Sequence, residues 1–167
     1  KEVQLIGMGP SKVQQALLSR SVDAAGILEP ILTIVEEKLK GAKVVVRADE
    51  MMKGQPGSTI AVRERVLAKH RAAIVKFVEL HIKATTLLKE HPEKAAKHVK
   101  NFIAKGLLKE STVLKALKSP SSNFAADPNG ILKQTEYMAK FQKSHKIKTK
   151  VSTDGLFDLS IYKDASK

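Results

Sequence analysis

Short apolar runs, separated by glycine, proline and polar turns, divide the first 65 residues of the chain. Four of these runs have the length and composition of β-strands: residues 3–6, 22–28, 43–46 and 58–63. Apolar residues at helical spacing predict two helices between them. The first is expected to start at Ser11, whose hydroxyl caps it with Gln14 three residues on, and the second to run from Pro30 to Gly41. Strands that alternate with helices predict an α/β layer with parallel strands.

From residue 66 onward the apolar positions recur at helical spacing only. They predict helices that end near His91, at Lys105 and at Ser119, and another that opens at Asp127 with a proline at its first position. Residues 156–159 form a late apolar anchor, before a tail that is expected to fray. The pattern therefore predicts an α/β region over residues 1–65 and a helical region over residues 66–167.

The charge of the chain raises the question of an anionic partner. The 167 residues carry a formal net charge of +13, and 25 of the 30 basic residues are lysines. They are spread along helical stretches and interleaved with acids, and aromatic residues make up only 4% of the chain. This favours a solvated lysine-rich surface over a nucleic-acid platform, which needs aromatic side chains for base stacking. A face that binds polyanions stays open as an alternative.

Motifs of catalysis and of cofactor binding are absent from the sequence. The chain has no cysteine, its five histidines form no pair at i, i+4, and neither a Gly-x-Ser-x-Gly elbow nor a phosphate-binding glycine loop occurs. We therefore expect no catalytic residue, no metal and no cofactor. The sequence also has no run of about eighteen apolar residues, the length needed to span a bilayer.

Two turns at the carboxyl ends of predicted strands are the best candidates for ligand contact. In open α/β sheets ligands bind outside these ends. The turn from Met8 to Ser11 leads into a helix whose first backbone N–H groups, at Ser11 to Val13, suit an anionic or polar atom. Glu29 ends the second predicted strand, and its carboxylate suits an amine or a hydroxyl group. Each of these features can also be a plain helix cap, and caps are far more common than binding sites.

The same residues resemble a known family. Residues 10–25, with their proline, helix, Ala-Leu pair, short turn and Val-Asp-Ala, resemble a stretch of nitrate/sulfonate/taurine-type solute-binding proteins. Glu29-Pro30 follows where that family has a Trp-Glu-Pro or Trp-Asp-Pro segment. Residues 56–64 resemble its loop at the edge of the ligand cleft and the strand after it. Residues 91–96 are similar to the start of one of its helices, and residues 156–160 to its closing segment.

The resemblance implies a type II periplasmic-binding-protein fold, present here in part. The chain would comprise part of the second lobe, with a parallel sheet, and a helical C-terminal region that packs on a first lobe. The implied function is capture of a small polar or anionic solute between two lobes and its delivery to an ABC permease and its ATPase. The protein would be extracytoplasmic, in the periplasm or at the cell surface, with or without a lipid anchor. The residues that match the family's cleft are Met8, Gly9, Ser11, Glu29, Gln55, Gly57 and Ser58.

Two features qualify this expectation. Leu28 stands where the family usually has tryptophan, which removes an aromatic wall and puts a typical sulfonate or taurine specificity in doubt. The early strand and helix of the second lobe and the whole first lobe are not in this chain, so its helices should expose apolar surface unless a first lobe or a second copy covers it. The alternatives are a basic module that binds nucleic acid or an anionic surface, and an enzyme of pyrimidine or thiamine precursor synthesis on the same fold.

Overall fold

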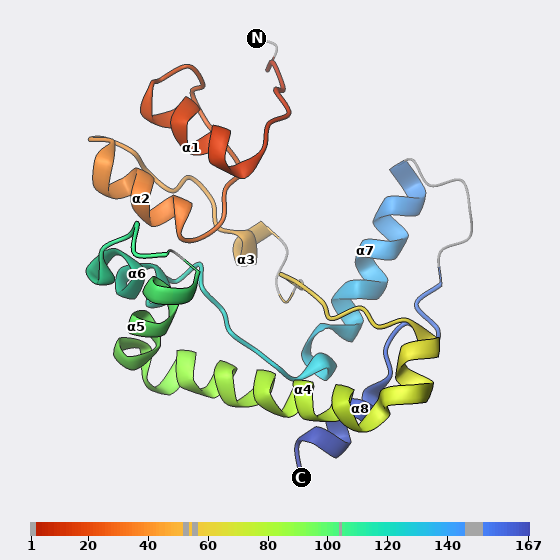
Figure 1. Cartoon of the computed structure of the whole chain (residues 1–167). Coiled ribbons are helices and arrows are strands. Elements are labelled where there is room, and N and C mark those ends of the chain that lie inside the picture. Colours follow the sequence, from red (N-terminus) through yellow and green to blue (C-terminus); the bar gives the residue numbers. More distant parts are fainter. Residues whose placement is uncertain (1–2, 52–53, 55–56, 104, 146–151) are drawn as a thin grey trace. The chain divides into compact units, whose positions relative to one another are not determined.

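A computed structural model describes residues 3–51, 54, 57–103, 105–145 and 152–167 of the chain (Figure 1). The described residues form helices α1 (Pro10–Leu18), α2 (Ile31–Lys38), α3 (Ala48–Met51), α4 (Glu64–Glu90), α5 (Pro92–Phe102), α6 (Glu110–Leu117), η1 (Pro128–Ile131), α7 (Leu132–His145) and α8 (Leu159–Ala165). They divide into two compact units. Unit 1 comprises residues 1–45 and 91–123, and unit 2 comprises residues 46–90 and 124–167.

In unit 1, four helices pack on one another around a buried core. Helix α1 packs on α2, α2 on α6, and α6 on α5. The most buried side chains belong to α2, α5 and α6: Thr33, Ile34, Val35, Ala95, Ala96, Thr112, Val113 and Ala116. The small side chains of α5 face α6, which allows the two helices to approach closely. Burial of one such valine or isoleucine contributes about 1.5–3 kcal/mol.

Unit 2 has a much smaller core. Helix α4 packs on α8, and η1 contacts both α7 and α8. Among the described residues of unit 2, only Ile161 and Thr85 are buried, although α4 alone has 27 residues. Helix α4 bends at His70, whose φ of −134° and ψ of 33° are not helical. Phe77 and Leu80 on α4 are more than half exposed.

An arginine clamp fixes the C-terminal helix of unit 2. Arg71 of α4 lies 2.7 Å from Asp164 through Nη1, and its Nη2 donates to Ser160 Oγ at 3.0 Å. Asp158 caps α8 by accepting from the Ser160 backbone N–H at 3.0 Å. Hydrogen bonding from Ser160 lowers the pKa of Asp158, and Lys167 and Arg71 lower the pKa of Asp164. The expectation that this tail frays is wrong, because the cap and the clamp order it.

The expected parallel sheet is not confirmed. No strand is formed in the part of the chain that the structure describes, and the segments 3–6, 22–28, 43–46 and 58–63 are irregular. A strand exists only through hydrogen bonds to a neighbouring strand, and these segments have no such neighbour within the described residues. Their apolar side chains are open to solvent: Val3, Leu5, Ile6, Leu28, Val45, Val46 and Ile60.

Two further expectations concern the helical region and the division of the chain. The region after residue 66 is helical in all its described regular elements, and Asp127 caps η1 by accepting from Asn129 N at 2.9 Å, as expected. The division at residues 65 and 66 was drawn from a change in sequence pattern. The two compact units are not this division, because each of them combines two separate segments of the chain. The division into residues 1–65 and 66–167 stays a prediction.

Candidate functional site

The first candidate turn lies directly before α1, in unit 1. Gly9 is the residue that caps the helix, and Pro10 occupies its first position, where the fixed φ of proline suits a helix and its missing N–H is not needed. Met8 is half-buried, while Gly9 and Ser11 are exposed. The expectation that the Ser11 hydroxyl caps the helix is wrong, because the helix begins one residue earlier and has no side-chain cap.

The backbone at this helix start is already partly engaged. Gly9 O accepts from Lys12 N at 3.0 Å and from Val13 N at 3.1 Å. The expectation that the N–H groups of Ser11 to Val13 are all free is therefore wrong. An anionic atom at this turn would find fewer free donors than the sequence indicates.

Glu29 occupies the second candidate turn and has the most distinctive environment of the candidates. Its Oε2 accepts from the Thr33 backbone N–H at 3.1 Å, so the carboxylate satisfies one of the open amides at the start of α2. The negative charge also suits the positive end of the helix dipole. Its Oε1 is buried and has no hydrogen-bond partner. A buried carboxylate oxygen without a donor costs about 1–3 kcal/mol or more, unless a ligand or water supplies the missing hydrogen bond.

The helix behind Glu29 is held rigidly. Thr33, which donates to Glu29, is only 1% exposed. At the other end of α2, Glu37 accepts from the Thr112 hydroxyl of α6 at 2.9 Å and lies 3.9 Å from Lys115. The Glu29 carboxylate thus lies at the start of a helix whose Thr33 is buried and whose other end is bound to α6 through Glu37.

The predicted site residues are divided between the two units. Met8, Gly9, Ser11 and Glu29 precede or begin α1 and α2, which pack on each other in unit 1. Gly57 and Ser58 belong to unit 2, where both are exposed in an irregular segment. Gln55 lies outside the described residues.

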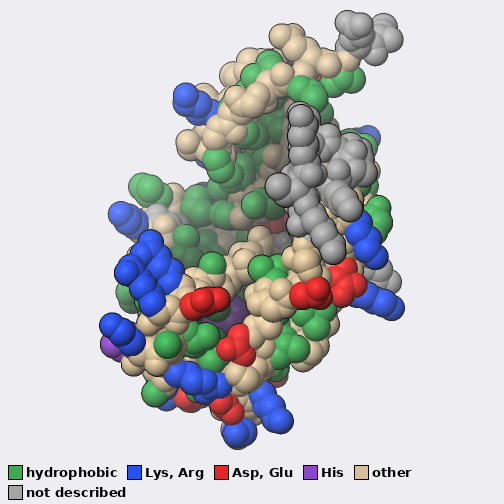
Figure 2. Space-filling view, turned by 90° about the vertical axis from the view of Figure 1, so that its right-hand side faces the viewer, with side chains coloured by type: hydrophobic (Ala, Val, Ile, Leu, Met, Phe, Trp, Pro, Cys, Tyr) green, Lys and Arg blue, Asp and Glu red, His purple; other side chains and the backbone are tan. Residues whose placement is uncertain are grey.

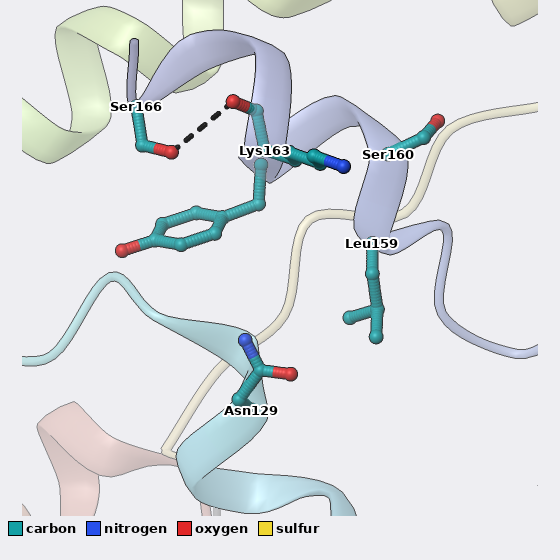
Figure 3. Close-up of a pocket in the computed structure, with 6 residues that line it drawn as sticks. Asn129, Leu159, Ser160, Lys163 and Ser166 are labelled. Carbon is teal, nitrogen blue, oxygen red and sulfur yellow. Dashed lines mark hydrogen bonds between the residues drawn. The ribbon is translucent and has the colours of Figure 1, made fainter.

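Two open hollows were not expected from the sequence. One, of about 510 Å³ in unit 2, is lined by Asn129, Leu159, Ser160, Tyr162, Lys163 and Ser166. Figure 3 shows Leu159 and Asn129 pointing toward the space between α8 and η1, while the Ser166 hydroxyl donates to the Lys163 carbonyl at 3.2 Å. The Asp158-Leu159-Ser160 cap is the signal that could have revealed α8, and with it this hollow.

The other hollow, of about 450 Å³, lies between α2 and α6 in unit 1. It is lined by Thr33, Glu36, Ser111, Leu114, Lys115, Lys118, Ser119 and Pro120. Small solutes are held in sites that bury most of their surface, and both hollows are wide open to solvent. None of the six predicted site residues that the structure describes lines either of them, and we therefore keep Glu29 as the centre of the candidate site.

Other kinds of site find no support in the described part of the chain. Its histidines, aspartates and glutamates form no group of three that could hold a metal ion. None of its helices combines the length and the apolar character required to cross a membrane.

The chain is similar to known binding proteins. The chain matches the model of the NMT1-like family over residues 1–104. It is 28% identical to a protein of Bacillus subtilis (strain 168) that is named for binding aliphatic sulfonates, over 98% of this chain and 48% of that protein. It is also 25% identical, over 61% of this chain and 32% of the other, to a protein of Brucella abortus (strain 2308) that is named only as a binding protein.

These matches also set limits. The chain spans about half the length of the Bacillus relative, and its matched segment covers about a third of the Brucella relative. No solved structure gives a significant match. Both named relatives are binding proteins and not enzymes by name, and the family implies the periplasmic-binding-protein fold. Because the family model covers well over half of the residues, this chain belongs to the NMT1-like family.

Proposed function

We propose that this chain is part of an extracytoplasmic solute-binding protein that captures a small polar solute and delivers it to an ABC permease. Membership of the NMT1-like family and the names of the relatives support this proposal. The single observation that carries the solute contact is the Glu29 carboxylate, with one oxygen bound to the start of α2 and the other buried without a donor.

The chemistry of Glu29 favours a solute that offers a hydrogen-bond donor. A carboxylate oxygen only accepts hydrogen bonds and repels another anion. An amine, an amidine-like ring N–H or a hydroxyl would satisfy Oε1, whereas a bare sulfonate or nitrate would not. An aliphatic sulfonate fits this site best when it also carries an amine. Because Leu28 replaces the usual tryptophan, aromatic stacking contributes less to the affinity for the solute.

A panel of matched solutes tests this proposal. We expect 2-aminoethanesulfonate to bind more tightly than ethanesulfonate, measured by calorimetry or by the rise in thermal stability that a ligand at a hundredfold excess over its Kd confers, about 2.7 kcal/mol. Glu29→Gln should weaken binding of the amine by tenfold or more, because it removes the charge that pairs with the ammonium. Glu36→Gln on the exposed side of α2 makes the same change in charge and should have little effect. Equal binding of both solutes, unchanged by Glu29→Gln, would contradict the assignment of Glu29.

A second lobe completes the proposed mechanism. Capture by cleft closure needs two lobes that move about a hinge, and the named relatives are about twice as long as this chain. The uncovered apolar residues of the irregular segments and of α4 are suited to pack on such a lobe; Figure 2 shows hydrophobic side chains at the surface, beside lysines and arginines. We expect this chain by itself to self-associate in light scattering. A stable monomer that unfolds cooperatively would contradict this part of the proposal.

A further inference from the structure

The segment that joins α5 to α6 in unit 1 combines exposed apolar side chains with unpaired lysines. Phe102, Ile103 and Leu107 are 80%, 75% and 88% exposed, among the highest values for large apolar residues in the described chain. The lysines around them occupy both the outer side of α5 and the turn that follows. We call this surface the basic corner; it comprises Lys94, Lys97, Lys100, Phe102, Ile103, Lys105, Leu107 and Lys109.

The charge of the basic corner is not neutralised locally. In the part of the chain that the structure describes, none of its five lysines takes part in an ion pair. Residues 91–110 contain only two acids, Glu93 and Glu110, and Glu93 is already paired with Lys118. The corner therefore presents a net positive charge at its surface.

The backbone presents these side chains in a defined way. Helix α5 ends at Phe102, and Gly106 N donates to Lys100 O at 3.0 Å, which closes the turn over the last carbonyls of the helix. Lys105 and Gly106 have φ values of 47° and 74°, in the left-handed region typical of such helix ends. Ala95 and Ala96 bind the opposite side of α5 to α6, so the lysines and the apolar tips are held on the outer side.

The composition of the basic corner argues for a lipid surface and against a protein lobe. Lysine is depleted in the buried centre of protein–protein interfaces, because its ammonium group loses hydration there. Surfaces that lie in the headgroup region of a bilayer combine lysine with phenylalanine and leucine, the apolar tips entering the acyl boundary while the lysines meet anionic headgroups. The surface of α4 around Phe77 and Leu80 differs in its charge, because the neighbouring Lys76 and Lys83 are both paired with Glu79, and it suits a protein partner better.

We propose that the basic corner docks this protein on a bilayer surface that contains anionic lipid. Docking of this kind goes beyond solute capture and does not depend on it. It would hold the binding protein near the membrane in which a permease lies. A nucleic acid is the less suitable partner, because three exposed aliphatic and aromatic tips would gain nothing from a phosphate backbone.

Vesicle flotation tests the proposal with the chain as it stands. We expect the protein to float with vesicles of phosphatidylcholine mixed with phosphatidylglycerol, to stay behind with phosphatidylcholine alone, and to be released as salt is raised. Each lysine near an anionic surface contributes a factor of about five in affinity. Lys97→Gln, Lys105→Gln and Lys109→Gln together should thus weaken binding roughly a hundredfold. Lys133→Gln, Lys140→Gln and Lys163→Gln make the same change in charge on exposed lysines of unit 2 and should weaken it no more than a fewfold.

A fluorescent reporter distinguishes docking through the basic corner from non-specific electrostatic attraction of the whole protein to the vesicles. The chain has no tryptophan, so Phe102→Trp introduces the only one, at an exposed position that leaves the core untouched. We expect its emission to shift to the blue on vesicles that contain phosphatidylglycerol, and the emission of Phe77→Trp on α4 to stay unchanged. The proposal is overturned if the two triple variants lose affinity equally, if both tryptophans shift alike, if neutral vesicles bind as well, or if the protein floats while Phe102→Trp does not shift.

Discussion

The core of unit 1 can be tested with one pair of valines that differ only in burial. Val113 on α6 is 2% exposed, whereas Val45 in an irregular segment is 91% exposed. Replacing either by alanine removes the same two methyl groups. At Val113 these groups leave a filled interior, and the loss of their burial costs about 0.8 kcal/mol each, with a further contribution from the cavity.

The expected magnitude follows from these contributions. Alanine is the better helix former, which returns a few tenths of a kcal/mol at Val113. We expect Val113→Ala to lower the free energy of unfolding of unit 1 by about 1–2.5 kcal/mol. Val45→Ala should change it by less than about 0.5 kcal/mol, as is usual for surface positions.

Urea unfolding distinguishes the two outcomes. Far-UV circular dichroism follows the helices of both units, while the two tyrosines of the chain, Tyr137 and Tyr162, lie in unit 2 and report on it alone. With slopes of about 1–3 kcal/mol per molar urea, Val113→Ala should move the unfolding midpoint of unit 1 by roughly 0.3–2.5 M. Equal shifts for the two variants, or a larger one for Val45→Ala, would refute the assignment of the core to α2, α5 and α6.

Three further predictions concern the polar contacts. Arg71→Ala should increase amide hydrogen exchange throughout α8, because it removes both the ion pair and the hydrogen bond that hold this helix on α4; unchanged protection of α8 would contradict the clamp. Hydrogen bonds from Lys76 and Lys83 lower the pKa of Glu79 from 4.5 to about 2, and the pKa of Asp164 is also lowered, so the stability that these carboxylates provide is present above pH 4.5 and lost as the pH falls toward 2. Glu79→Gln should flatten this acid dependence in tyrosine fluorescence, and an unaltered acid profile would contradict it. Thr112→Val leaves the carboxylate of Glu37 without its hydroxyl donor and should cost unit 1 about 1–2 kcal/mol in urea unfolding, whereas Thr112→Ser should cost less than half of that.

The helices were the part of the fold that the sequence predicted well, because their signals are local. Pro92 at the start of α5 and Asp127 before η1 act through neighbouring backbone groups, and both mark helix starts in the structure. Where two local signals competed, the prediction failed: Ser11 resembled a cap, but Pro10 can begin a helix one residue earlier and does so. The α8 helix was missed although Asp158 offers a local cap; the Arg71 contact that also holds the helix comes from 89 residues away from Ser160 along the chain.

The sheet and the site depend on packing between separate parts of the chain, which a local sequence pattern does not reveal. Strand-like runs such as residues 43–46 carry the right composition, but a strand also needs a partner that no local pattern supplies. Glu29 could be singled out by its place before Pro30. That one of its oxygens would be used by Thr33 and the other left buried depends on how α2 packs, and no spacing in the sequence indicates it.

The interleaving of the two units has a consequence for the order in which the chain folds during synthesis. Unit 1 needs residues 91–123 to complete its core, and between its two segments lies the whole first segment of unit 2, residues 46–90, which includes all of α4. At about 5–20 residues per second, several seconds pass between the emergence of α2 and that of α6, its partner. Neither unit can be complete before residue 123 has been synthesised. The nascent polypeptide should therefore remain an open substrate for chaperones or for an export machinery until most of it has been made.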